Sequence, residues 1–192
     1  YEDSIEELKR FINIYPKHDR LSYAYYLLAM SYYEQIADEK TDLGSIIDAQ
    51  QNFQFIMDNY PNSDFALDAE YKLELIQEIL ASKEMYLAKY YIEREKWIPA
   101  INRYKIVVKE YDTTIYVEEA LHRLVEIHYK IGLIEESKKY ASLLGYNYQS
   151  SEWYEESYKV FNKDYKKISK RKKEKNKLST LEKIKSMLKN ER

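Results

Sequence analysis

The sequence contains no cysteine, and only three of its 192 residues are glycine and three are proline. Without cysteine, these residues can form no disulfide, thiolate nucleophile or cysteine–zinc site. Glycine and proline supply the turns between β-strands, so their scarcity argues against β architectures. No apolar run approaches the roughly 18 residues needed to span a bilayer, and the start, YEDSIEELKR, does not resemble a signal peptide. The expected fold class is therefore all-α.

The charges are distributed unevenly along the chain. Residues 1–158 contain 17 Lys and Arg against 29 Asp and Glu, whereas residues 159–192 contain 14 against 4. The basic part includes a dense run: Lys166, Lys167, Lys170, Arg171, Lys172, Lys173, Lys175 and Lys177. Such a run can contact nucleic-acid phosphates or anionic lipids, but it lacks the aromatic residues of most single-stranded nucleic-acid sites. We therefore expect residues 161–192 to be a lysine-rich tail, helical or disordered.

A motif defined by four spaced residues recurs four times along the chain, each time with the same spacing between those residues. We call this motif the recurring phrase. A small residue is followed after four positions by an aromatic or apolar residue, after three more by an apolar residue, and after four more by a tyrosine. The copies begin at Ser4, Ala49, Ala100 and Ser137 and end at Tyr15, Tyr60, Tyr111 and Tyr148. Steps of three and four keep side chains on one face of a helix, and the small residue permits close approach of a neighbouring helix. We expect the terminal tyrosine to close each helix.

This phrase resembles the second half of a tetratricopeptide repeat, which predicts a superhelical stack of helical hairpins. The copies are 45, 51 and 37 residues apart, so residues 1–160 should form a domain of about four to five degenerate repeats. The first repeat lacks its first helix, which suggests an upstream part. Between Pro61 and Pro99, apolar residues recur at alternating spacings of three and four, which favours one long helix between repeats, or two helices with a barely marked joint. The expected helices cover residues 2–15, 18–38, 45–60, 63–93, 97–111, 117–131, 134–144 and 152–168, with Gly145 as a helix stop.

The chemistry-bearing residues indicate binding and not catalysis. His122 and His128 are six positions apart, on nearly opposite sides of a helix, so they cannot chelate one metal together. No zinc-protease, phosphate-binding or nucleophile-elbow motif occurs, so we expect no enzyme activity, no cofactor and no metal. Tyrosine is abundant, and the repeat pattern places Tyr23, Tyr26, Met30 and Tyr33 on the concave surface. These residues either grip a partner segment or simply pack between helices.

Several long strings resemble the BamD family, the tetratricopeptide lipoproteins of the bacterial outer-membrane β-barrel assembly machinery, especially its α-proteobacterial members. The similar strings are RFINIYPKH, MSYYEQI, YPNSDFALDA, KEMYLAKYYIEREKWIPAINRYKIVVKEYDTT and EALHRLVEIHYKIGLIEESKKYASLLGYNYQSSEWYEESY. They cover roughly residues 1–160. The lipidated cysteine and signal peptide of this family are absent, which fits a fragment. Asp112 stands where many relatives have the proline that closes the third phrase.

The resemblance implies a non-enzymatic scaffold on the periplasmic face of the outer membrane, attached by a lipid anchor outside this fragment. Its C-terminal repeats would bind BamA, with Arg103, Lys109, Thr113 and Thr114 as the candidate contacts. Its N-terminal repeats would receive unfolded outer-membrane β-barrel proteins, with Tyr23, Tyr26, Met30 and Tyr33 as the candidate groove. Other assembly subunits would be partners, and no nucleic acid is expected. The alternative is a soluble tetratricopeptide adaptor whose basic tail contacts nucleic acid or anionic lipid.

Overall fold

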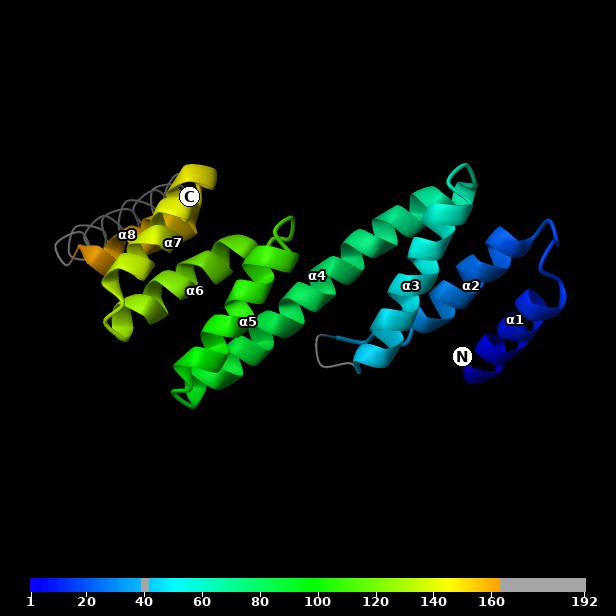
Figure 1. Ribbon diagram of the computed structural model, residues 1–192, viewed down its shortest axis with the longest axis horizontal. Coiled ribbons are helices and arrows are strands. Elements are labelled where there is room, and N and C mark those ends of the chain that lie inside the picture. Colours follow the sequence, from blue (N-terminus) through cyan, green and yellow to red (C-terminus); the bar gives the residue numbers. More distant parts are fainter. Residues whose placement is uncertain (39–41, 163–192) are drawn as a thin grey trace, which may run out of the picture. The chain divides into compact units, whose positions relative to one another are not determined.

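The computed structural model describes residues 1–38 and 42–162 (Figure 1). This part contains eight α-helices and no strand, which confirms the all-α, tetratricopeptide-like prediction. The helices are α1 (Glu2–Ile14), α2 (Leu21–Tyr33), α3 (Leu43–Asn59), α4 (Asp64–Glu93), α5 (Trp97–Glu110), α6 (Val117–Lys130), α7 (Ile134–Asn147) and α8 (Glu152–Phe161). The lysine-rich run predicted at residues 166–177 lies outside the described residues.

The described part of the chain divides into two compact units, one up to residue 117 and the other from residue 118 on. In the first unit, each helix from α1 to α5 packs against the next, and α2 also contacts α4. Its core is built mainly from α2, α3 and α4, around fully buried side chains such as Ile46, Phe53, Ile56 and Ile76. In the second unit, α7 packs against α8.

Three of the four copies of the recurring phrase bury their small residue as the spacing predicts, whereas Ser4 of the first copy is exposed. The small residues in α3, α5 and α7, which are Ala49, Ala100 and Ser137, have no exposed surface. Ser137 also donates its hydroxyl to the carbonyl of Val125 at 2.7 Å, which satisfies a buried polar group. The final tyrosine of every copy is the residue directly after a helix: Tyr15, Tyr60, Tyr111 and Tyr148 end α1, α3, α5 and α7. Each of these tyrosines donates its backbone N–H to the carbonyl four residues earlier.

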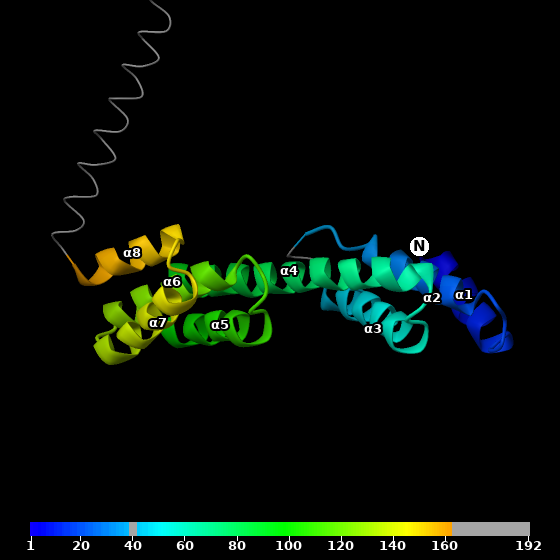
Figure 2. The ribbon, with the colours of Figure 1, turned by 90° about the horizontal axis from the view of Figure 1, so that it is seen from above.

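Helix α4 is unbroken over 30 residues, as the apolar spacing predicts. Within the first unit, Figure 2 shows α3 and α5 on the same side of α4, and Figure 1 shows them along different parts of it. Helix α3 accompanies the N-terminal part of α4 and α5 the C-terminal part. One long helix therefore joins two successive hairpins.

Several helix boundaries differ from the sequence prediction, most clearly those of α2 and α7. Helix α2 is shorter than residues 18–38, because the N–H groups of Gln35 and Ile36 bond to carbonyls only three residues back. The prediction that Gly145 stops α7 was wrong, since the helix continues through it to Asn147. A Cβ atom at Gly145 would lie 2.6 Å from the Tyr154 ring of α8, so the glycine serves close helix packing. Helix α8 was expected to extend to residue 168, and residues 163–168 lie outside the described part.

Helix α8 is held on α6 by contacts of His122. The Nδ1 atom of His122 is 2.9 Å from the Ser157 hydroxyl, and both side chains are buried. The Trp153 ring packs on the His122 ring at 5.3 Å between centroids, and the Arg123 guanidinium lies 5.5 Å from the Trp153 ring. The Ser151 hydroxyl accepts the Trp153 N–H at 3.2 Å and caps the start of α8.

Candidate functional surfaces

The four residues predicted to form a groove lie on α2 and contact α4 or the core; we call Tyr23, Tyr26, Met30 and Tyr33 the α2 patch. The Tyr26 hydroxyl donates to Asp68 Oδ2 on α4 at 2.6 Å. The Phe65 ring of α4 lies 5.3 Å from the Tyr23 ring and 5.1 Å from the Tyr26 ring, and Lys72 Nζ lies 4.6 Å from the Tyr33 ring. The patch therefore takes part in packing between α2 and α4.

The members of the α2 patch differ in accessibility. Tyr23 is 44% exposed, whereas Tyr26, Met30 and Tyr33 are half-buried and pack against the core. Burial and the hydrogen bond to Asp68 raise the pKa of Tyr26 to about 12, and burial also raises the pKa of Tyr33. Tyr23 is therefore the most accessible member of the patch.

The predicted BamA contacts lie on α5 and in the turn after it. Arg103 Nη1 lies 3.1 Å from Glu84 Oε2 on α4, so this guanidinium already has a partner within the unit. Lys109 is exposed and lies 2.6 Å from Oε1 of its neighbour Glu110, which raises the pKa of the lysine. Thr114 is only 5% exposed and donates its hydroxyl to the Tyr111 carbonyl, whereas Thr113 is exposed. Lys109 and Thr113 are therefore the accessible members of this set.

Sequence reasoning missed a concave surface beside α4. Glu70, Leu73, Glu74, Gln77 and Glu78 line it together with the threonines of the α5–α6 turn, over a volume of about 490 Å³. The sequence did contain a signal: three glutamates at i, i+4 and i+8 repel one another on a helix, which is unfavourable without a compensating partner.

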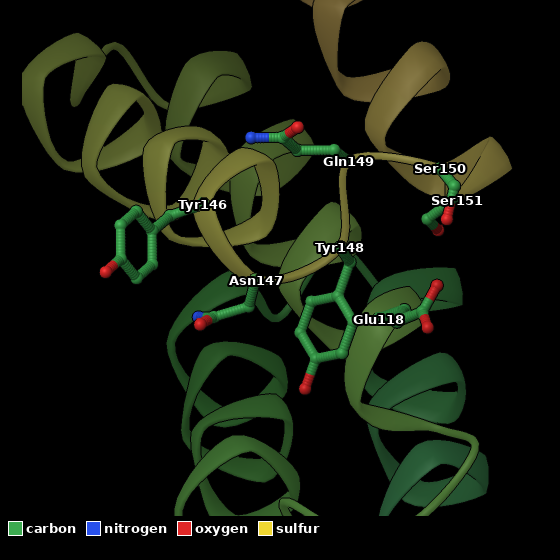
Figure 3. Close-up of a pocket in the computed structure, with 7 residues that line it drawn as sticks. All are labelled: Glu118, Tyr146, Asn147, Tyr148, Gln149, Ser150 and Ser151. Atoms are coloured by element: carbon green, nitrogen blue, oxygen red, sulfur yellow. The ribbon is translucent and has the colours of Figure 1, made fainter.

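The second unit contains another concave region, of about 510 Å³. Figure 3 shows its lining side chains coming from the end of α7, the turn before α8 and Glu118 at the start of α6. Tyr146 at this rim is 84% exposed, and the other lining residues of the turn are mostly polar. From the sequence we predicted only that a helix ends here at Gly145, and we predicted no binding surface.

The histidines are structural in the described part of the chain. His128 Nδ1 lies 2.7 Å from the Leu124 carbonyl, and His122 contacts Ser157. Across residues 1–38 and 42–162, no three His, Cys, Asp or Glu side chains are grouped so that they could hold a metal ion. None of the helices in these ranges is long and apolar enough to cross a membrane.

Comparison with known proteins identifies the family. Residues 1–144 match the family model YfiO, described as outer membrane lipoprotein. The chain belongs to this family. Two similar relatives are outer membrane protein assembly factors BamD: that of Rickettsia prowazekii is 39% identical over 83% of this chain, and that of Caulobacter vibrioides is 37% identical over 84%. BamD of Neisseria gonorrhoeae is 31% identical over 66%.

These matches confirm the resemblance deduced from the strings, including its α-proteobacterial character. The chain spans 64% of the Rickettsia relative and 53% of the Caulobacter relative. In this YfiO/BamD family member, the matched region 1–144 includes the α2 patch, the α5 residues and the concave surface beside α4. The Figure 3 region lies partly beyond it.

Proposed function

We propose that this chain is the helical-repeat part of a non-enzymatic scaffold that assembles β-barrel proteins at the periplasmic face of the outer membrane. The observation that carries the proposal is the match of residues 1–144 to a family of outer membrane lipoproteins, with relatives named outer membrane protein assembly factors. The family description also supports a lipid anchor in the full protein. A stack of hairpins suits such a role, because repeat proteins expose extended surfaces for binding partners.

BamA is the proposed partner of the C-terminal repeats, through Arg103, Lys109, Thr113 and Thr114. Lys109 and Thr113 support this role by their exposure at the end of α5. The test is a pull-down of BamA from solubilised outer membrane on the immobilised 192-residue chain. Lys109→Glu should reduce BamA capture severalfold, since it reverses a charge at an exposed position. Lys17→Glu makes the same change in an exposed turn of the N-terminal region and should leave capture unchanged.

Arg103 needs its own control, because it pairs with Glu84. Arg103→Glu removes both a potential contact and the internal ion pair, whereas Glu84→Gln breaks the pair and keeps the guanidinium. If Arg103 contacts BamA, Arg103→Glu lowers capture and Glu84→Gln does not. Equal losses in both variants would mean that Arg103 only supports the packing of α5 on α4. Full capture by Arg103→Glu and Lys109→Glu together would refute the proposed BamA surface.

The α2 patch is the proposed site for unfolded clients. Its four aromatic or thioether side chains support contact with an aromatic chain end, because such rings give large contact areas. The test uses a synthetic barrel C-terminal strand peptide with a photoreactive group beside its terminal aromatic residue. Tyr23→Ala should reduce crosslinking severalfold, since Tyr23 is the most exposed member of the patch. Tyr146→Ala, at another exposed ring, is the matched control, and equal crosslinking in the two variants would contradict the proposal.

A further inference from the structure

Lys72 is a cation at the contact between α4 and the α2 patch. Its Nζ atom lies 4.6 Å from the centroid of the Tyr33 ring, and the residue is half-buried. Among the described residues, no carboxylate forms an ion pair with this ammonium. The face of an aromatic ring attracts an ammonium but does not neutralise its charge. An anionic ligand can therefore pair with Lys72 without displacing an internal carboxylate.

Two carboxylates lie near this end of the patch, and neither is paired with Lys72. Asp68 Oδ2 accepts the Tyr26 hydroxyl at 2.6 Å, so this oxygen already has a partner. Glu34 is exposed, and water and salt screen its charge. Burial raises the pKa of Tyr33 most, and the charges of Glu34 and Asp68 raise it further. The ammonium of Lys72 is the group here that favours a bound anion.

Tyr71 borders the open side of the contact between α2 and α4. At 100° per residue, Ala69 and Ile76 lie on one side of Lys72 around the helix, and neither has any exposed surface. Tyr71 lies on the opposite side of Lys72 and is 57% exposed. It is also near enough to Tyr33 to contribute to the raised pKa of that phenol. An accessible ring and an ammonium therefore lie at the same end of the patch.

The two ends of the patch differ in chemistry. At the other end, the exposed Tyr23 ring contacts Phe65 at 5.3 Å, and both side chains are uncharged. Tyr23 and Tyr33 are ten positions apart on α2, which corresponds to about 15 Å along the helix. An extended chain covers about 15 Å in four to five residues. A segment that carries a negative charge at one end would therefore bind in one direction, with that charge at Lys72.

The C-terminal residue of a chain can supply a ring and a negative charge together. When this residue is aromatic, its ring and its carboxylate belong to one residue, which matches the neighbouring Tyr71 and Lys72. We propose that Lys72 binds the C-terminal carboxylate of an extended client strand, with the last ring of the strand against Tyr71 and its upstream residues toward Tyr23. This inference rests on the proposed client site and adds the charge and the direction that it recognises.

The test compares two fluorescein-labelled peptides by fluorescence anisotropy, titrated with the full 192-residue chain. Both have the sequence Gly-Ser-Val-Thr-Leu-Thr-Val-Thr-Phe, and one ends in a carboxylate and the other in an amide. The carboxylate peptide should bind about tenfold more tightly to the unchanged chain, because charge-assisted hydrogen bonds are stronger than neutral ones. Lys72→Met keeps the aliphatic stem over the Tyr33 ring, and it should remove this preference without changing the affinity for the amide peptide.

Two control variants make the charge effect specific. Lys72→Arg keeps the positive charge and should keep the preference for the carboxylate. Lys17→Met removes the same charge from an exposed turn and should bind both peptides like the unchanged chain. Circular dichroism of Lys72→Met should match that of the unchanged chain, since Lys72 takes part in no ion pair among the described residues. Equal binding of the two peptides to the unchanged chain, or equal loss of both in Lys72→Met, would overturn the inference.

Tyr23→Ala separates this inference from the proposed client site. It should weaken both peptides severalfold, because it removes a ring contact and no charge. If it does so while the unchanged chain binds both peptides equally, the client site stands and the role of Lys72 is refuted. If neither peptide binds, or if Tyr23→Ala changes the affinity for neither, the client site is refuted and this inference is refuted with it.

Photo-crosslinking tests the direction of binding. Benzoylphenylalanine in place of the last residue of the carboxylate peptide should give adducts on Tyr33 or on residues 71–75. The same group in place of the leucine four residues earlier should give adducts near Tyr23 and Phe65. The reverse distribution, or the same adducts from both peptides, would overturn the proposed direction and the pairing with Lys72.

Discussion

Tyr26 and Asp68 join two successive hairpins: the phenol hydroxyl on α2 donates to a carboxylate oxygen on α4 at 2.6 Å. The two residues are 42 positions apart, and their bond accompanies the ring contacts of Tyr26 with Phe53 and Phe65. Hydrogen bonds to a charged group are stronger than neutral ones. The same tyrosine that was predicted to meet a ligand therefore also helps fix α2 on α4.

Tyr26→Phe should lower the free energy of unfolding by about 1.5 kcal/mol, because it removes a charge-assisted hydrogen bond and keeps the ring. The measurement is urea unfolding followed by circular dichroism. Tyr146→Phe removes a hydroxyl from an exposed ring and should change stability by less than about 0.5 kcal/mol. In a double-mutant cycle with Asp68→Ala, a coupling energy near zero would show that the contact contributes nothing.

The Tyr26 hydroxyl should also lose its proton at a higher pH than an ordinary tyrosine. Its folded pKa of about 12 lies above the ordinary tyrosine value of 10.0, so the unfolded chain loses this proton first. The stabilisation from the raised pKa is fully present below pH 10 and is lost as the pH rises toward 12. Absorbance at 295 nm should show that the unchanged chain, compared with Tyr26→Phe, has one additional group titrating near pH 12. An additional group titrating near pH 10 would contradict the environment described for Tyr26.

The recurring phrase was predictable because its consequences are local. A four–three–four spacing determines which side of a helix Ala49, Phe53 and Ile56 occupy, and all three are fully buried. The positions of the closing tyrosines follow from the same spacing, because each tyrosine is the residue directly after the last residue of its helix. The unbroken α4 was also readable, because no glycine or proline occurs between residues 61 and 99.

The features that were missed depend on tertiary contacts. Gly145 looked like a helix stop, and only the approach of Tyr154 from α8 explains a glycine within the helix. The concave surface beside α4 depends on the turn after α5, whose Ile115 N–H bonds to Glu78, and no local sequence pattern reveals this contact. The α5 residues were chosen by resemblance, and the internal pairing of Arg103 with Glu84 could not be read from residues 19 positions apart.

Gly145→Ala should destabilise the second unit, although alanine favours a helix by about 1 kcal/mol over glycine. The added Cβ would lie 2.6 Å from Tyr154 Cε2 and 3.3 Å from Cδ2, so the ring or α8 must move. We expect a net loss of about 1 kcal/mol in urea unfolding. In a Tyr154→Ala background the clash is absent, and there Gly145→Ala should stabilise. Stabilisation in both backgrounds would mean that the ring shifts without cost.

Glu126 should make the second unit sensitive to acid. Hydrogen bonding with His122 and then with Arg123 lowers the pKa of Glu126 to about 2, against the desolvation that raises it. Glu126 Oε2 lies 3.5 Å from His122 Nε2 and 2.8 Å from Arg123 Nη1. Because the folded pKa is below the ordinary glutamate value of 4.5, this stabilisation is present above pH 4.5 and is lost as the pH falls toward 2.

Glu126→Gln should therefore cost stability at pH 6 and cost progressively less as the pH falls. The side chain of Glu126 is 43% exposed, so solvent screening limits the loss at pH 6 to about 1 kcal/mol. Urea unfolding followed by Trp153 fluorescence in a Trp97→Phe background reports on this unit, since Trp153 packs on His122. Glu155→Gln, an exposed change on α8, is the control. A stability difference between Glu126→Gln and the unchanged chain that stays constant from pH 6 to pH 2 would show that Glu126 does not ionise differently in the folded state.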